Sequence, residues 1–325
     1  MPGKKRPELA ACALQAVEPV TGGLPTGKEK FLRRSLVSVC AELAEAGLDL
    51  SPSTLSRLLE EQGFRLRVNA KRYAGPPHPD RERQFEYLEE QKEEFFQADH
   101  PVVSVDAKKK ELIGNFAQAG RAWGRAAERV NDHDFAKDAL GRAVPYGIYD
   151  VLNNHGFVMV GSSADTPAFA VHAIKAWWVR FGSKRYRLAK RLLLLADAGG
   201  SSGCRPWCWK LALQQEVADR YGLEVTVCHY PTGASKYNPI EHRLFGPIST
   251  NWAGQPLRSF ERMVELIRGT RTQTGLEVEA VLDQNTWPKG QKVSQAQRAD
   301  LRLIRHEICP QWNYTIYPRR LHLLN

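Results

Sequence analysis

Apolar residues recur at three- and four-residue spacings in the first part of the chain, a pattern that predicts amphipathic helices. From Lys28 onward, the repeating apolar positions are Phe31, Leu32, Leu36, Val39, Leu43 and Ala44. A second short helix is predicted from Ser51, a good N-cap residue, with Pro52 at the first helical position, to Gly63. The tight turn at Gly47 between them predicts a helix-turn-helix.

The second predicted helix carries polar side chains near its start, where a recognition helix contacts base edges. Ser53, Thr54 and Arg57 are therefore candidate DNA-binding residues. Further basic residues follow the helix, which favours DNA, and these are Arg65, Arg67, Lys71 and Arg72. The alternative is a plain helical hairpin without a role in DNA binding, and the sequence leaves both open.

Proline and glycine divide the chain into segments. Residues 1–27 are rich in both and predict a flexible leader, and residues 28–75 hold the predicted helix-turn-helix domain. Residues 76–100 begin with a proline-rich linker and continue into a strongly acidic connector helix. Its apolar stripe of Phe85, Leu88 and Phe95 can dock on either neighbouring domain, while a charged face is usually solvated.

The pattern changes to buried strands after His100, and residues 101–325 form one further predicted domain. Strands are predicted over 101–106, 146–152, 157–161, 191–196 and 223–229, with a long polar insertion over 107–144. Helices are predicted over 165–181 and 205–221, and another begins at Asn238. Three strands followed by alternating helices and strands predict an α/β fold, a mixed sheet flanked by helices.

Three acids stand at informative places in this pattern. Asp106 and Asp197 each end an apolar strand, and Glu241 lies near the start of a later helix. Groups at the carboxyl ends of strands face the ligand crevice of an open α/β sheet. Converging carboxylates suit Mg²⁺, for which Mn²⁺ can substitute, and two such ions can clamp an in-line displacement at phosphorus.

Each acid also has a structural explanation. Asn238 and Glu241 have the spacing of a capping box, in which the helix start alone accounts for both residues. Asp106 and Asp197 can simply begin strand-end turns. Three other acids compete for the role, namely Asp134, Asp150 and Asp165.

Charge changes the picture because it is unevenly distributed along the chain. The formal net charge is +10, yet residues 1–100 hold 15 Lys and Arg against 16 Asp and Glu, whereas residues 101–325 hold 31 against 20. A basic domain that contains a few special acids favours a polyanionic partner. Lys108, Lys109 and Lys110 follow the first acid and are candidate phosphate contacts, or else solvated loop lysines.

The cysteines do not predict a disulfide framework, because six of them stand at irregular spacings in a long chain. Cys204, Cys208, Cys228 and His229 suggest zinc, but the paired spacing of a zinc site is absent, so buried free thiols are expected. The sequence has no membrane-length apolar run and no signal peptide, which predicts a cytosolic protein without a membrane partner.

Several longer motifs resemble one family. They are SVDAKKKELIGNF, NDHDF, VPYGIYDV, DTPAFAVHAIKAWW, LLLLADAGGSSG, VTVCHYPTGASKYNPIEHRLF, ISTNWAGQPL and WNYTI. Together they resemble the Rhodopirellula-type DDE transposases of bacterial insertion sequences (the ISAzo family), from about residue 30 to residue 320. The segment leading into Asn-Pro-x-Glu also resembles mariner-like transposases. One departure is Ser202, where the family more often has asparagine.

The resemblance implies an RNase H-like catalytic domain with Asp106, Asp197 and Glu241 as the metal-binding catalytic triad. It implies two Mg²⁺ ions, double-stranded DNA as partner (the terminal inverted repeats of the element and a target), and at least a homodimer when two ends are brought together. Two other hypotheses remain. One is a shortened relic or repressor that binds DNA without transposing it, and the other is a host nuclease acting on RNA–DNA hybrids.

Overall fold

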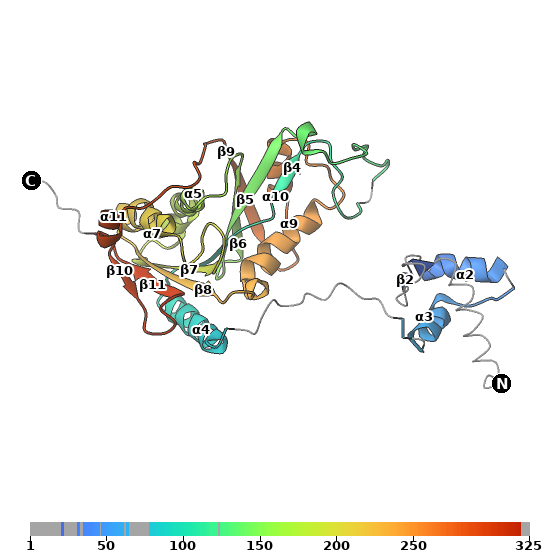
Figure 1. Cartoon of the computed structure of the whole chain (residues 1–325), viewed down its shortest axis with the longest axis horizontal. Helices are drawn as coiled ribbons and strands as arrows, with labels where there is room; N and C mark the ends of the chain where they lie inside the picture. The colour runs from blue at the N-terminus through green and yellow to red at the C-terminus, as the bar shows by residue number, and fades with distance from the viewer. Residues whose placement is uncertain are drawn as a thin grey trace, which may run out of the picture. The chain divides into compact units, whose positions relative to one another are not determined.

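The computed structural model describes residues 21–22, 31–32, 35–45, 47–61, 63–64, 78–122 and 124–319. The chain divides into two compact units, Met1–Ala74 and Gly75–Asn325 (Figure 1). Most of the predicted leader and the basic residues after the second helix lie outside the described residues.

The first unit contains the predicted pair of short helices, α2 (Leu36–Glu45) and α3 (Pro52–Glu61). Ser51 caps α3, because its Oγ accepts a hydrogen bond from the Thr54 backbone N–H at 3.2 Å. The two helices share a small apolar core formed by Val39, Cys40, Leu43, Leu55, Leu58 and Leu59. Their role as a DNA-binding helix-turn-helix stays a prediction.

The helical pattern predicted from Lys28 is wrong in its first turns. Phe31–Leu32 (β2) instead pairs antiparallel with Thr21–Gly22 (β1). The helix starts only after Ser35, whose Oγ accepts a hydrogen bond from the Ser38 backbone N–H at 3.1 Å. A capping side chain therefore decides the start of α2, where apolar spacing alone suggested an earlier one.

The second unit is built on a nine-stranded mixed sheet. Its strands are β3 (Val102–Ala107), β4 (Glu111–Ile113), β5 (Gly141–Asp150), β6 (His155–Gly161), β7 (Arg191–Asp197), β8 (Glu224–Tyr230), β9 (Glu277–Asp283), β10 (Leu303–Arg305) and β11 (Asn313–Ile316). The order is β10-β11-β8-β7-β3-β5-β6-β9, and β4 pairs with β5. β5 is antiparallel to β3 and β6, whereas β3, β7 and β8 run parallel. This central arrangement confirms the predicted RNase H-like α/β fold.

The sequence pattern missed four strands. β4 lies inside the segment predicted as a polar insertion, and β10 and β11 contain only three and four residues. β9 alternates exposed glutamates with buried apolar residues at its start, so it lacks the continuous apolar run of the central strands. Short or half-exposed strands give weak periodicity, and their pairing with neighbours reveals them only in the fold.

Helices cover both faces of this sheet. One face packs against α5 (Pro167–Trp177) and α7 (Trp207–Leu213), with Trp177 and Trp209 fully buried. α5 continues into the π-helical segment η3 (Trp178–Gly182) and the short helix α6 (Ser183–Arg185). α7 continues in the same way into η4 (Gln214–Ala218) and α8 (Asp219–Tyr221). The remaining short helices are η2 (Ala136–Asp138), η5 (Ser235–Tyr237) and α11 (Gln295–Ala299).

The opposite face is shared by two groups of helices. The acidic helix α4 (Arg81–Gln97) packs over β3, β7 and β8 through Leu88 and Phe95. η6 (Glu241–Phe245), α9 (Gly246–Asn251) and α10 (Phe260–Arg268) pack over β5, β6 and β9. The segment that carries Glu241 therefore lies over β5, the neighbour of the strand β3 that carries Asp106. None of the helices in the described residues is long and apolar enough to cross a membrane.

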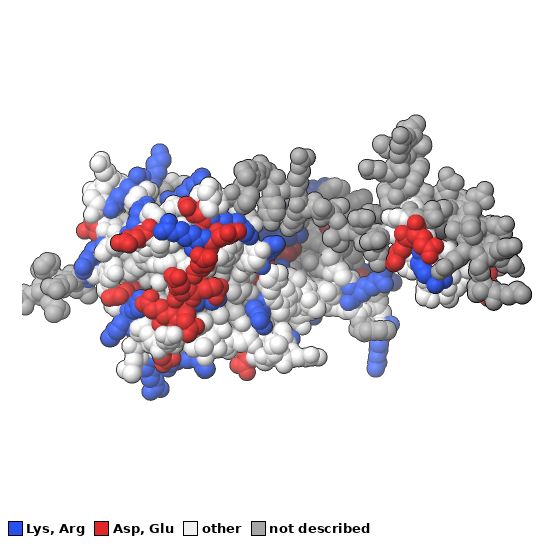
Figure 2. All heavy atoms as spheres, turned by 90° about the horizontal axis from the view of Figure 1, so that it is seen from below, with Lys and Arg blue, Asp and Glu red and all other residues white. Residues whose placement is uncertain are grey.

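A buried amide fixes α4 to the sheet. The Gln84 side chain is fully buried, and its Nε2 donates to the His229 carbonyl at 2.9 Å and to Asn313 Oδ1 at 2.8 Å. The exposed face of α4 is strongly acidic, and acidic side chains gather on the side of the unit shown in Figure 2. The predicted connector helix is thus an integral layer of the second unit.

We expect Gln84→Ala to lower the free energy of unfolding of the second unit by about 2 kcal/mol or more, because it leaves buried acceptors without donors. Gln97→Ala is the matched control and should change stability little, because it removes an exposed glutamine whose side chain, among the described residues, bonds to the neighbouring Glu93. Urea denaturation measures both. Equal stability of the two variants would contradict the anchoring role of Gln84.

Candidate active site

Asp106 and Asp197 stand side by side at the carboxyl ends of two parallel strands. In the register of β3 and β7, Val105 pairs with Ala196, so the two aspartates occupy the next position on adjacent strands. The residues before them are buried, which holds both strand ends rigidly in the sheet. Both aspartates are half-buried and line the same cavity.

Glu241 approaches from the helical segment on the sheet, in the first position of the π-helical turn η6. Two strand glycines permit this close approach. Gly147 pairs with Asp106 across β5 and β3, and a Cβ on it would lie 2.6 Å from the Phe245 ring and 2.9 Å from Ile240. Gly156 on β6 similarly faces Leu244. With no side chains at these positions, η6 lies directly on the sheet.

The three acids lie close enough to interact, and this interaction contributes to a raised pKa of Asp106. Burial is the main cause that raises the pKa of Asp106 to about 8, and the charges of Asp197 and Glu241 and a hydrogen bond with Glu241 add to the rise. The Ala107 N–H, which donates to Asp106 Oδ1 at 2.7 Å, acts in the opposite direction. The fold therefore brings three carboxylates together against their mutual repulsion.

Asn238 connects Asp197 at the end of β7 to Ser104 on β3, a role that the sequence did not reveal. It is fully buried, and its Nδ2 donates to Asp197 Oδ1 at 3.0 Å while its Oδ1 accepts a hydrogen bond from Ser104 Oγ. The Ile240 N–H in turn donates to Ser104 Oγ at 3.2 Å. The capping-box explanation of Asn238 and Glu241 is therefore wrong, since this amide is used to position Asp197.

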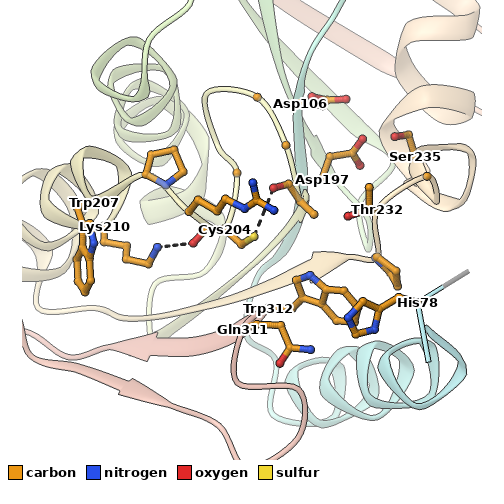
Figure 3. A pocket seen from close by; sticks show the side chains of 18 of the residues that line it. His78, Asp106, Asp197, Cys204, Trp207, Lys210, Thr232, Ser235, Gln311 and Trp312 are labelled. Carbon is orange, nitrogen blue, oxygen red and sulfur yellow. Dashed lines mark hydrogen bonds between the residues drawn. The ribbon is translucent and has the colours of Figure 1, made fainter. Parts of the chain in front are cut away.

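A cavity of about 1020 Å³ opens in front of the two aspartates (Figure 3). The glycine-rich loop after Asp197 forms part of its wall, and Thr232 and Ser235 lie on the side opposite that loop. In the part of the chain that the structure describes, no three His, Cys, Asp or Glu side chains are arranged to hold a metal ion as they stand. The donor chemistry is present, while Glu241 is hydrogen-bonded to Asp106 and does not line the cavity.

The competing acids have other environments. Asp150 lies at the other end of the strands from Asp106, where it pairs with Val103 at the start of β3 and accepts hydrogen bonds from Tyr186 at 2.9 Å and from Asn153. Asp165 pairs with Lys110 at 3.5 Å, and Thr166 rather than Asp165 caps α5. Asp134 is exposed.

The cysteines near the cavity do not gather. Cys204 Sγ contacts the Ala198 carbonyl at 3.4 Å and Cys208 Sγ the Gln291 carbonyl at 2.9 Å, while Cys228 is fully buried. The two ring nitrogens of His229 lie 2.8 Å from the Trp312 carbonyl and 3.0 Å from the Ser202 carbonyl. Of these three cysteines and His229, only Cys204 lines the cavity, and the expectation of buried thiols is confirmed for Cys228 but wrong for Cys204 and Cys208, which are half-buried.

The candidate DNA contacts are spread over both units. Lys108 is half-buried with its Nζ 4.9 Å from the centre of the Trp252 ring, and burial lowers its pKa. Lys109 is exposed. In the first unit, Arg57 is exposed, whereas the hydroxyls of Ser53 and Thr54 each lie 2.9 Å from Ser51 Oγ. Their contacts with DNA stay predictions.

Residues 13–318 match the family described as the Rhodopirellula transposase DDE domain. The chain belongs to this family. No curated protein matches it in sequence. Among solved structures, this transposase-family chain is similar to the Mos1 transposase paired-end complex with left transposon end, at 13% identity and a TM-score of 0.42, over 80% of this chain and 69% of that one. It is also similar to the Mos1 strand transfer complex, at 14% identity and a TM-score of 0.40, over 82% and 70%.

For the metal site that the sequence predicts at Asp106, Asp197 and Glu241, we expect Gly147→Ala to weaken Mn²⁺ binding about tenfold or more, because the added methyl group pushes η6 and Glu241 away from Asp106. Gly141→Ala on the same strand is the control. Its added methyl group would lie 3.2 Å from the Phe260 ring of α10 and would not touch η6, which carries Glu241. Isothermal titration calorimetry measures binding, and circular dichroism checks the fold. Unchanged binding in Gly147→Ala would contradict this packing argument.

Asp106 should make the stability of the metal-free protein depend on pH. Burial and the neighbouring acids raise the pKa of the Asp106 carboxyl to about 8 in the folded protein, whereas its ordinary pKa of 3.8 applies in the unfolded chain. The folded state binds more protons between these values, so stability should fall as the pH rises from about 4 to about 8. Asp106→Asn should flatten this part of the profile, measured by denaturation in chelator. A curve of unfolding free energy against pH that stays parallel to that of the parent protein in Asp106→Asn would contradict the raised pKa of Asp106.

Proposed function

We propose that this protein cuts DNA at the ends of an insertion sequence and joins those ends to target DNA, with Asp106, Asp197 and Glu241 as its catalytic residues. The observation that carries the proposal is the meeting of these acids, which are far apart in the chain, at the carboxyl ends of β3 and β7. Membership of a transposase family supports DNA as the substrate.

The donor set of this site fits a divalent cation. Asp106 is surrounded by two further carboxylates that raise its pKa, and a bound cation would relieve their repulsion and allow Asp106 to lose its proton. Asp106 and Asp197 would hold Mg²⁺ or Mn²⁺, and Glu241 would complete the ligands. Solved Mos1 complexes include one with Mn and one with Mg. When bound, two such ions supply charge neutralisation at the phosphoryl oxygens and lower the pKa of water.

The reaction proposed for this site has two displacement steps and needs no protein nucleophile. In the first step, water attacks a phosphodiester, the phosphorus–O3′ bond breaks, and a free 3′-hydroxyl forms. In the second step, that hydroxyl attacks a phosphodiester of target DNA and a new phosphorus–oxygen bond replaces the old one. Glu241 orients the attacking oxygen, Asn238 fixes Asp197, and the site works by alignment and by neutralising charge.

The partner in this proposal is double-stranded DNA, both the terminal inverted repeats and the target. The exposed side chain of Arg57 on α3 and the exposed Lys109 beside the active site are suited to phosphates. Joining two ends in one reaction implies a complex of at least two copies of the chain. The protein would act in the cytoplasm of a bacterial cell, on the DNA of the nucleoid.

Asp197→Asn should lower Mg²⁺-dependent cleavage of supercoiled DNA carrying the element's ends by about a hundredfold or more, because it removes a charge that the cations require. Asp134→Asn is the control, since it makes the same chemical change at an exposed acid outside the cavity. DNA binding and the melting temperature should stay unchanged in both.

Two results would refute the proposal. Cleavage that persists in Asp197→Asn would remove the catalytic assignment. DNA binding by the parent protein without any cleavage would favour the transposition-inactive relic or repressor instead.

A further inference from the structure

The cavity in front of the aspartates has a second, chemically different end. Figure 3 shows Trp207 and Lys210 at the opposite end from Asp106. Arg205, Lys210 and Arg305 line the cavity, and the only carboxylates among its lining residues are Asp106 and Asp197. One continuous cavity therefore has Asp106 and Asp197 at one end and Lys210 at the other, and Arg305 lies near enough to Lys210 to lower its pKa. We refer to the three cations that line this cavity, Arg205, Lys210 and Arg305, as its basic end.

Lys210 is an unusual lysine, because it is only 1% exposed yet has no carboxylate partner among the described residues. Its Nζ donates to the Cys204 carbonyl at 2.5 Å, and it lies 5.4 Å from the centre of the Trp207 ring and 5.2 Å from that of Tyr314. Burial, followed by the nearby charge of Arg305, lowers the pKa of Lys210 to about 8. A buried cation next to another cation favours an anionic ligand.

The two arginines of the basic end are exposed, so they can reach a ligand directly. Arg305 Nη1 donates to the Pro310 carbonyl at 2.6 Å, and neither guanidinium is ion-paired in the described part of the chain. Arg205 stands eight positions after Asp197, at the end of the loop whose Cys204 carbonyl accepts the Lys210 hydrogen bond. This hydrogen bond fixes the basic end relative to the acidic end.

We propose that the basic end binds a phosphate of the DNA strand that is cut, while the phosphate under attack lies at Asp106 and Asp197. This inference rests on the proposed function, because continuity of the cavity with the catalytic acids is what identifies the anion as part of the DNA strand. Arg205 and Arg305 contact the phosphate. Lys210 adds positive charge and holds the loop after Asp197 through its hydrogen bond to the Cys204 carbonyl. The strand is thereby held at two points, which sets the scissile bond in register with the acids.

The test compares two double variants with equal loss of charge. Arg205→Gln with Arg305→Gln removes the exposed cations of the basic end, and Arg180→Gln with Arg187→Gln removes two exposed arginines outside this cavity. Binding of a fluorescein-labelled duplex carrying a single-stranded 3′ extension is measured by anisotropy against salt concentration, with Ca²⁺ in place of Mg²⁺. We expect the magnitude of the slope of log affinity against log salt to fall by about 1 in the first pair only, because one phosphate contact is lost.

The outcomes separate this inference from the proposed function. The same change of slope in both pairs, or in neither, would overturn the basic-end site, whatever the cleavage assay shows. Failure of the proposed function would appear as DNA cleavage that persists in Asp197→Asn. The binding comparison between the two double variants would still test the basic end in that case. If inorganic triphosphate binds tightly and only that binding is lost in the first pair, the site takes a free phosphate ligand and the inference fails.

Discussion

The site depends on the repulsion between three carboxylates that the fold forces together. Asp106 pays for this proximity with a pKa raised to about 8, because its charged form is disfavoured by burial and by the charges of Asp197 and Glu241. The folded protein tolerates this repulsion because the packing of the sheet and its helices stabilises the fold by more free energy than the repulsion costs. In the function we propose, a bound divalent cation would offset this repulsion and would supply metal-dependent chemistry at phosphorus.

The rest of the second unit holds these acids in place through contacts that are themselves uncharged. Adjacent parallel strands fix the two aspartates, and the Asn238 amide bonds to Ser104 Oγ and Asp197. Gly147 and Gly156 leave room for the segment that carries Glu241. Glycines and a buried amide are therefore as necessary to the site as the acids, although they carry no charge and perform no chemistry.

Charge is unevenly distributed over the second unit, and the DNA substrate that we propose would meet this distribution. The exposed face of α4 is acidic and repels phosphates, while the cavity wall beyond the aspartates carries unpaired cations among the described residues. The net charge of +10 therefore conceals a strongly polarised surface. The same helix completes the core through Gln84 and Leu88, so its acidic face is fixed on one side of the second unit.

The sequence by itself determined the elements with strong local patterns: the central strands that end in Asp106 and Asp197, the cap at Ser51, and the family motifs around Glu241. It missed β9 to β11, whose patterns are short or half-exposed, and it misplaced the start of α2, where Ser35 decides. Only the tertiary structure decided that Asn238 holds Asp197 rather than capping a helix, and that Lys210 is buried beside the same cavity. These features arise from contacts between segments far apart in the chain, and local spacing carries no information about such contacts.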